Sequence, residues 1–292
     1  MSSKPSVVSW LFEDLGYHWY MLSQNKLTVI GLGILMSVLL IGMFAPSLVK
    51  YSPYQTNAMI TLQPPSMDYP FGTDRYGRDV LSRVFYATRI DFVLAISSVM
   101  AAFSIGAVIG ALSGYVGGKT DKLVMGIMDV ILTFPSFLLA IGLMASLGAT
   151  LVNLFISQMV IRIPIFARLV HGQMLSVKEN EYAEAAICAG NSRLRIIFYH
   201  LIPNCIPPAL VLITLNFGYA ILNIAGLSFL GLGLRPPESE WGLMVAEGAP
   251  YITTGEWWLS FFPGMFIVSS VLGFNLTGDG INDLLDPKRR RR

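Results

Sequence analysis

The sequence predicts an all-α integral membrane protein with six transmembrane helices. Of its 292 residues, 54% are hydrophobic and only 13% are charged, about half the roughly 25% that is usual in soluble domains. Several apolar runs reach the length of about 18 residues or more that spans a bilayer. The formal net charge is only +2, and no helix carries a basic stripe. The composition therefore argues against a nucleic-acid partner and in favour of membrane lipid.

Hydropathy places the six spans, and the polar stretches between them divide the chain. The first apolar run is longer than the hydrophobic part of a signal peptide. Pro207 and Pro208 interrupt the fifth span. The expected spans are 27–45, 92–112, 123–144, 150–170, 206–231 and 258–276. The expected units are a cytoplasmic segment (1–26), a first helix with an external segment (27–91), a core (92–277) and a basic cytoplasmic tail (278–292).

The distribution of Lys and Arg predicts the orientation, because cytoplasmic loops of membrane proteins are enriched in these residues. With both termini in the cytoplasm, six bases lie outside and thirteen lie inside. The inner ones are Lys4, Lys26, Lys119, Lys122, Arg168, Lys178, Arg193, Arg195, Lys288 and Arg289 to Arg292. The outer ones are Lys50, Arg75, Arg78, Arg83, Arg89 and Arg235. We therefore expect a multi-pass protein with cytoplasmic N- and C-termini.

Gly106, Gly110 and Gly114 recur every four residues in the second span. Small residues at this spacing form a smooth stripe that allows another helix to approach closely. Close packing within the bundle is the role we expect for them.

A polar segment of about two dozen residues, NEYAEAAICAGNSRLRIIFYHLIPN (180–204), separates two apolar runs. Apolar and small residues recur in it at spacings of three and four, as on a helix face. Asn180 is suited to cap a first helix, Gly190 to end it, and Asn191 or Ser192 to cap a second helix that Pro203 stops. The pattern alone leaves two alternatives open: a helix pair on the membrane surface, or a small-residue face that receives a partner.

The run Glu184-Ala185-Ala186, then Gly190 and Pro203, resembles the EAA loop of ABC importer permeases. The His200-x-x-Pro203-Asn204 ending resembles the dipeptide/oligopeptide/nickel branch, in its C-type permease. Three further stretches are similar to the same branch: FGTDRYGRDVLSRVFYATRI (71–90), PPESEWGLMVAEG (236–248) and GFNLTGDGINDLLDPK (273–288).

The resemblance implies a type I ABC importer transmembrane domain in a bacterial plasma (inner) membrane, with the coupling loop at about 171–205. It implies four further subunits or partners: a homologous second permease, two cytoplasmic ATPases and an extracellular or periplasmic binding protein. ATP and Mg would be bound by the ATPases, with no cofactor on this chain. The residues implied in ATPase docking are Glu181, Glu184, Ala185, Ala186, Gly190, Arg193, His200 and Pro203. The implied substrates are di- or oligopeptides, with nickel chelates or glutathione-like peptides as the alternative.

The stretch 76–89 predicts a separate amphipathic helix on the external side. Its arginines would reach lipid head groups, or it would form a docking or gate surface for a binding protein. Arg78, Asp79 and Arg83 belong to that surface, and Trp241 in the 236–248 loop is expected either at the membrane interface or in the gate.

Asp129 and Arg162 lie at similar expected depths in neighbouring spans, about 9 and 12 Å from the inner ends at 1.5 Å per residue. An acid within a span requires a partner, so we expect these two residues to form an intramembrane ion pair.

Catalytic and metal sites are not expected. Neither Cys188 nor Cys205 has the spacing of a metal or redox site, the histidines are scattered, and no Ser/His or His/Glu/His set lies within the spans. The near match SGYVGGKT (113–120) lacks the first glycine of a phosphate-binding loop and follows a membrane helix. An ion-coupled carrier is the less favoured alternative, because it would show inverted repeats and mid-membrane acids.

Overall fold

A computed structural model of the protein describes residues 25–285. Most of the predicted N-terminal segment lies outside them, as do the last seven residues of the predicted tail, which carry all of its bases. The described residues form helices joined by loops, the longest of which is 49–79. This loop contains one isolated antiparallel bridge, between Thr73 and Asp79. The elements are α3 (Lys26–Leu48), η1 (Ala58–Ile60), α4 (Val80–Val116), α5 (Gly118–Thr133), α6 (Ser136–Leu147), α7 (Leu151–Val160), α8 (Ile163–Val177), α9 (Glu181–Cys188), α10 (Arg193–Arg195), η2 (Ile196–Leu201), α11 (Ile202–Phe229), α12 (Trp241–Gly248), η3 (Ala249–Thr254) and α13 (Trp258–Leu285).

Five helical stretches among the described residues are long and apolar enough to cross a membrane, and a sixth crossing requires α5 and α6 to act as one bent span. The all-α multi-pass prediction is confirmed. The straight span expected at 123–144 is wrong, because α5 and α6 meet at an angle of 90°. The break lies at Phe134 and Pro135, since proline disfavours helical geometry in the residue before it.

The second span is much longer than the expected 92–112, because α4 runs unbroken for 37 residues. It begins where the Asp79 side chain caps the amide of Ser82 at 2.9 Å, and it ends at Gly117, whose φ is +68°. The separate surface helix predicted at 76–89 is therefore wrong. The expected boundary between residues 91 and 92 also falls inside α4.

Three other predicted helix boundaries differ from the structure, two of them near prolines. The fourth span is divided at Ile161 and Arg162, with Pro164 in the first turn of α8. Pro203 does not stop a helix: it follows the π-helical turn η2 and lies in the first turn of α11, where a missing N–H costs no helical bond. The last span extends to Leu285 rather than 276.

The predicted glycine stripe packs against α8, which confirms its structural role. A Cβ on Gly106 would lie 2.7 Å from the Ile163 carbonyl oxygen and 2.9 Å from the Ala167 amide nitrogen. A Cβ on Gly110 would overlap the Ala167 carbonyl oxygen. Only glycine therefore allows the backbones of α4 and α8 to approach so closely.

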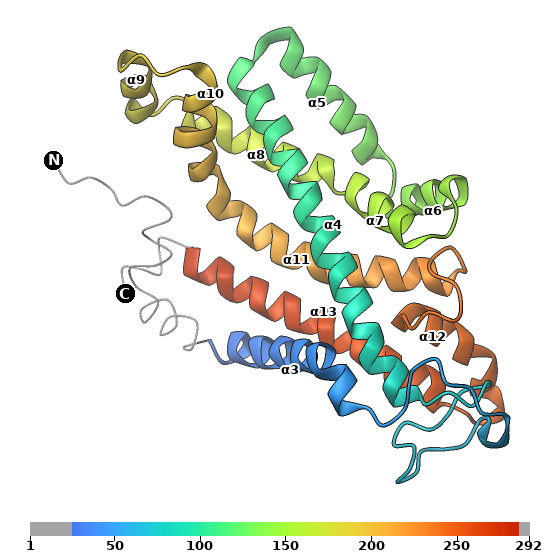
Figure 1. Ribbon diagram of the computed structural model, residues 1–292. Coiled ribbons are helices and arrows are strands. Elements are labelled where there is room, and N and C mark those ends of the chain that lie inside the picture. Colours follow the sequence, from blue (N-terminus) through green and yellow to red (C-terminus); the bar gives the residue numbers. More distant parts are fainter. Residues whose placement is uncertain (1–24, 286–292) are drawn as a thin grey trace.

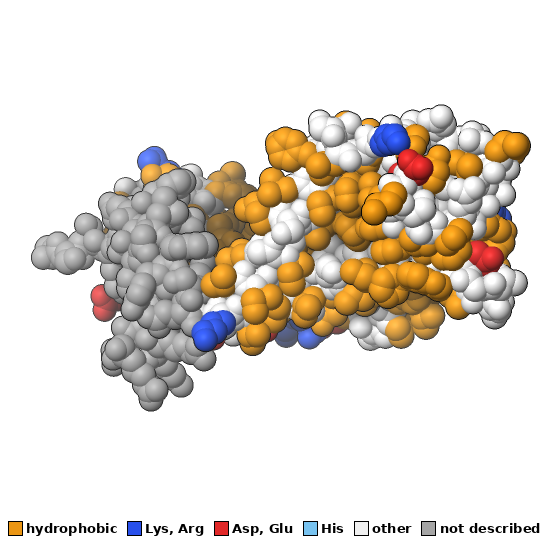
Figure 2. All heavy atoms as spheres, turned by 90° about the horizontal axis from the view of Figure 1, so that it is seen from below, with side chains coloured by type: hydrophobic (Ala, Val, Ile, Leu, Met, Phe, Trp, Pro, Cys, Tyr) orange, Lys and Arg blue, Asp and Glu red, His pale blue; other side chains and the backbone are white. Residues whose placement is uncertain are grey.

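Different elements lie at the two ends of the bundle (Figure 1). The α9 end carries α9, α10 and the junction of α4 with α5, whereas the α12 end carries the segment 49–79, α12 and η3. Between them, Figure 2 shows a broad hydrophobic surface with few charged side chains. Such a surface is expected of a protein in contact with lipid.

Candidate functional site

The α9–α10 segment (residues 180–204) has the predicted form of a helix, a glycine turn and a second helix. Gly190 ends α9 with φ +75°, a left-handed conformation that glycine adopts without steric cost. Ser192 caps the second helix by accepting a hydrogen bond from the Arg195 amide at 3.4 Å. Asn180 precedes α9 but makes no side-chain cap bond.

The small-residue face of α9, which was expected to receive a partner, packs partly against the same chain. Ala183 and Ala186 are buried in a cluster of the same chain with Ile197, Leu201 and Cys205. They therefore hold α9 against η2 and α11 and are not free to receive a partner. Of the docking residues implied by the resemblance, the exposed ones are Glu181, Glu184, Ala185, Gly190 and Arg193, whereas His200 and Pro203 are half-buried.

The exposed side of the α9–α10 segment is unusually apolar for a loop. Five large hydrophobic residues are exposed there: Tyr182, Ile187, Leu194, Phe198 and Tyr199. Glu181 and Glu184 are exposed in the same segment. An apolar patch bordered by charges is typical of a surface that binds another protein.

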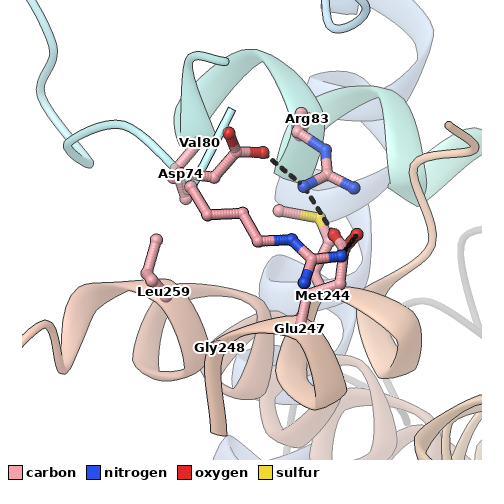
Figure 3. Close-up of a pocket in the computed structure, with 8 residues that line it drawn as sticks. Asp74, Val80, Arg83, Met244, Glu247, Gly248 and Leu259 are labelled. Atoms are coloured by element: carbon pink, nitrogen blue, oxygen red, sulfur yellow. Dashed lines mark hydrogen bonds and ion pairs between the residues drawn. The ribbon is translucent and has the colours of Figure 1, made fainter. Parts of the chain in front are cut away.

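At the opposite end, four charged residues form a buried polar cluster (Asp74, Arg78, Arg83 and Glu247) that joins the segment before α4 to α12. Asp74 Oδ2 accepts from Arg78 Nε at 2.6 Å and from Arg83 Nη1 at 2.8 Å. Glu247 Oε2 lies 2.9 Å from Arg83 Nη1 and 3.3 Å from Arg78 Nη2. Figure 3 shows Asp74, Arg83 and Glu247 converging on one another from separate elements.

The residues expected to form an external docking or gate surface are buried instead. Arg78, Asp79, Arg83 and Trp241 are 3%, 4%, 1% and 0% exposed, so none of them reaches lipid head groups or a partner in this structure. The two acids and two bases of the cluster neutralise one another, which is how buried charges are tolerated; the exposed Arg75 also lies 3.7 Å from Glu247. The cluster is an internal clamp on α12.

A second set of contacts holds the start of α12 against α4. The Trp241 indole donates to the Val84 carbonyl at 3.0 Å, and the Trp241 amide donates to Asp91 Oδ2 at 3.1 Å. Glu240 caps α12 through the amides of Gly242 and Leu243, at 2.8 and 2.7 Å. Asp91 lies against Glu240, and both carboxyls are fully buried.

Burial raises the pKa of Glu240 above its ordinary value of 4.5, although the two amide bonds oppose the shift. A carboxyl with a raised pKa in the folded state binds its proton more tightly there than in the unfolded chain. The contribution of Glu240 to the free energy of unfolding should therefore be greatest below pH 4.5. It should fall as the pH rises through the pKa of Glu240 in the folded state.

Replacing Asp91 with Asn should relieve this contact, because it leaves one titratable carboxyl where two buried carboxyls now face each other. We expect Asp91→Asn to raise stability at pH 7 by at least about 1 kcal/mol and to flatten the dependence of melting temperature on pH. Thermal melting of the purified protein between pH 4 and 8 measures both effects. Asp68→Asn, at an exposed site, is the control. An unchanged pH profile in Asp91→Asn would show that the two carboxyls do not interact.

The expected ion pair between Asp129 and Arg162 is wrong. Asp129 pairs instead with Arg168, whose Nε donates to Asp129 Oδ1 at 3.0 Å. Arg162 is 2% exposed and bonds within its own turn to the carbonyl and side-chain oxygens of Gln158, at 2.8 and 2.7 Å. The difference arises because the fourth span ends at Val177 rather than at 170. Arg162 is therefore fifteen residues from the inner end and Arg168 is nine, so Arg168 lies closer to the expected depth of Asp129.

The structure also brings together Ser113, Asp121 and His171 at the α9 end. Asp121 Oδ1 accepts from the Ser113 hydroxyl at 2.6 Å and lies 2.8 Å from His171 Nε2. The hydroxyl bonds to the carboxylate rather than to the imidazole, so this is not the arrangement that activates a serine nucleophile. The contacts join the ends of α4, α5 and α8.

Residues 106–291 match the family described as "Binding-protein-dependent transport system inner membrane component". The chain belongs to this family. Residues 15–65 also match the N-terminal transmembrane domain of oligopeptide transport permease C. The protein is thus a multi-pass permease subunit of a bacterial transport family and has the type I ABC importer transmembrane fold.

Curated relatives cover nearly the whole chain. It is 43% identical to a dipeptide transport system permease protein of Alkalihalophilus pseudofirmus, over 92% of this chain and 88% of the relative. It is 42% identical to a probable D,D-dipeptide transport system permease protein of Escherichia coli, over 92% and 90%. It is 39% identical to an oligopeptide transport system permease protein of Bacillus subtilis, over 92% and 88%.

Proposed function

We propose that this permease subunit forms half of the translocation path of an ATP-driven importer for di- or oligopeptides. The observation that carries the proposal is the shared identity of about 40% with peptide permeases along most of the chain. The exposed apolar patch on the α9–α10 segment supports a second element of the proposal, namely the coupling of this chain to a separate motor protein.

The proposed assembly contains a homologous second permease, two cytoplasmic ATPases that bind ATP and Mg, and a binding protein that delivers the peptide. The excess of Lys and Arg in the sequence segments expected inside, thirteen against six, supports a cytoplasmic position for the α9 end and for both termini. The α12 end would then face the outside.

In the proposed mechanism, the α9–α10 segment moves with the ATPases and changes the bundle between two states. The structure offers a path for this movement. Ala183 and Ala186 attach α9 to the cluster of Ile197, Leu201 and Cys205, and that cluster continues into the long helix α11. A force applied to α9 would therefore reach the middle of the bundle through packed side chains.

The test of this function is ATP-dependent uptake of a radiolabelled dipeptide by cells that carry the intact complex, with Glu184→Arg as the variant. Glu184 is exposed, so the charge reversal should leave the permease folded and in the membrane. Its reversed charge should repel a basic docking surface and lower uptake at least about tenfold. Wild-type uptake by Glu184→Arg would exclude Glu184 from coupling, and absence of dipeptide uptake by the wild type would refute the substrate.

A second variant tests docking separately from transport. Ala185→Trp places an indole on the exposed side of α9, away from the buried Ala183 and Ala186. We expect it to prevent co-purification of the ATPases. Ala58→Trp adds the same side chain at an exposed site at the α12 end and should leave co-purification unchanged. Equal co-purification by the two variants would contradict the docking assignment.

A further inference from the structure

Arg89 is an exposed arginine within a membrane-spanning helix. It is the tenth residue of α4, about 14 Å from the start of the helix at 1.5 Å per residue. Its two neighbours in sequence at this end, Arg78 and Arg83, are buried and paired with acids. By contrast, Arg89 makes no hydrogen bond or ion pair with any side chain in the described part of the chain. Charged side chains within a membrane span usually pair with another group, and an anion from another molecule would supply the partner that the described residues do not.

An open apolar groove of about 510 Å³ extends from Arg89 between α3 and α4. Gly42 allows the helices to approach here, because a Cβ on it would lie 2.7 Å from Thr88 Cγ2. The apolar lining comes from both helices: Leu39 and Met43 of α3, and Phe92, Val93, Ile96 and Met100 of α4.

The groove offers a single free polar group. The groove is lined by two hydroxyls, and both donate to carbonyls of their own helix. Thr88 donates to the Val84 carbonyl at 3.2 Å, and Ser97 donates to the Val93 carbonyl at 2.5 Å. Arg89 is the only charged residue in the lining. Its guanidinium thus lies at one end of a surface that is otherwise without hydrogen-bonding capacity.

The dimensions of the groove match one leaflet. Met100 follows Arg89 by eleven residues, which is about 16 Å along α4. Half of a hydrocarbon core of roughly 30 Å is about 15 Å. Because α4 begins at the α12 end, the cation lies toward the head groups and the apolar lining extends toward the bilayer centre.

We propose that Arg89 and the α3–α4 groove bind an anionic phospholipid. The phosphate accepts hydrogen bonds from the Arg89 guanidinium, whose planar fork suits phosphate oxygens, and one acyl chain lies along the apolar lining. A zwitterionic lipid binds less well, because its own ammonium group competes with Arg89 for the phosphate. This site is independent of the transported substrate.

Native mass spectrometry of the intact permease complex tests the site. The complex is exposed to equal amounts of phosphatidylglycerol and phosphatidylcholine before it is released from detergent. We expect preferential retention of phosphatidylglycerol by the wild type and a loss of about tenfold in Arg89→Ala, the size expected for charge-assisted hydrogen bonds. Arg235→Ala removes another exposed arginine at the same end of the bundle and should retain the lipid.

Filling the groove supplies a second, independent variant. Val93 is 65% exposed, so Val93→Trp should be tolerated by the fold while its indole occupies the space for the acyl chain. We expect it to lose phosphatidylglycerol although Arg89 is intact. Equal retention of the two lipids by the wild type would overturn the proposal. So would unchanged retention in Arg89→Ala or Val93→Trp, or displacement of the lipid by inorganic phosphate alone.

Discussion

Replacing Asp74 with alanine should destabilise the folded protein by about 3–5 kcal/mol, the usual cost of removing one partner from a buried ion pair. Asp74 is the most connected member of the polar cluster. Besides Arg78 and Arg83, it accepts bonds from the amides of Tyr76 and Arg78, at 2.8 and 2.9 Å. Without it, two buried arginines share the single carboxylate of Glu247. We expect α12 to detach and the permease to be scarce in the membrane.

Asp68→Ala is the matched control for this change. Asp68 also forms an ion pair, with Lys50 at 3.6 Å, but both side chains are mostly exposed. Exposed pairs contribute about 0–1 kcal/mol, so this variant should resemble the wild type. Membrane abundance and thermal melting compare the two. Equal losses in both variants would mean that burial of the cluster does not determine its energy.

Replacing Gly110 with valine should separate α4 from α8. A Cβ at this position overlaps the Ala167 carbonyl oxygen and lies 2.9 Å from the His171 amide nitrogen. Both obstacles are backbone atoms, which cannot move aside as a side chain can. We expect a cost at or above the upper end of the 1–3 kcal/mol that overpacking usually causes, seen as a lower melting temperature and poor recovery.

Gly126 in α5 provides the comparison, because a Cβ there meets nothing within 4 Å. Gly126→Val should change the melting temperature little, since the added side chain meets no neighbour at this half-buried helical site. A melting temperature for Gly110→Val equal to that of Gly126→Val would refute close α4–α8 packing.

The sequence predicted the features that depend on local pattern. The long apolar runs of α3 and α13 require no partner to be recognised, because their length alone matches the bilayer. The glycine turn after α9 was also predictable, since Gly190 is suited to a left-handed residue at a helix end. The Phe134-Pro135 break carried a local signal as well, but hydropathy masked it because the apolar run continues on both sides.

The polar cluster was not predicted because its acids and bases come from distant parts of the sequence. Arg78 and Arg83 resemble a solvated surface until Glu247 is placed beside them, and Glu247 lies 164 residues further along the chain than Arg83. The same limit applies to Asp129 and Arg168, which are 39 residues apart. Pairing them required the inner end of the fourth span, which lies at Val177 rather than at the predicted 170.

Photocrosslinking from Cys188 tests the proposed coupling most directly. The chain has two cysteines, of which Cys188 is exposed at the end of α9 and Cys205 is buried. A benzophenone maleimide applied to the intact complex should therefore label Cys188 selectively, with Cys188→Ala as the blank. The account predicts a light-dependent adduct with an ATPase subunit. Adducts with lipid alone, or none beyond the blank, would contradict the assignment of the α9–α10 segment as the coupling surface.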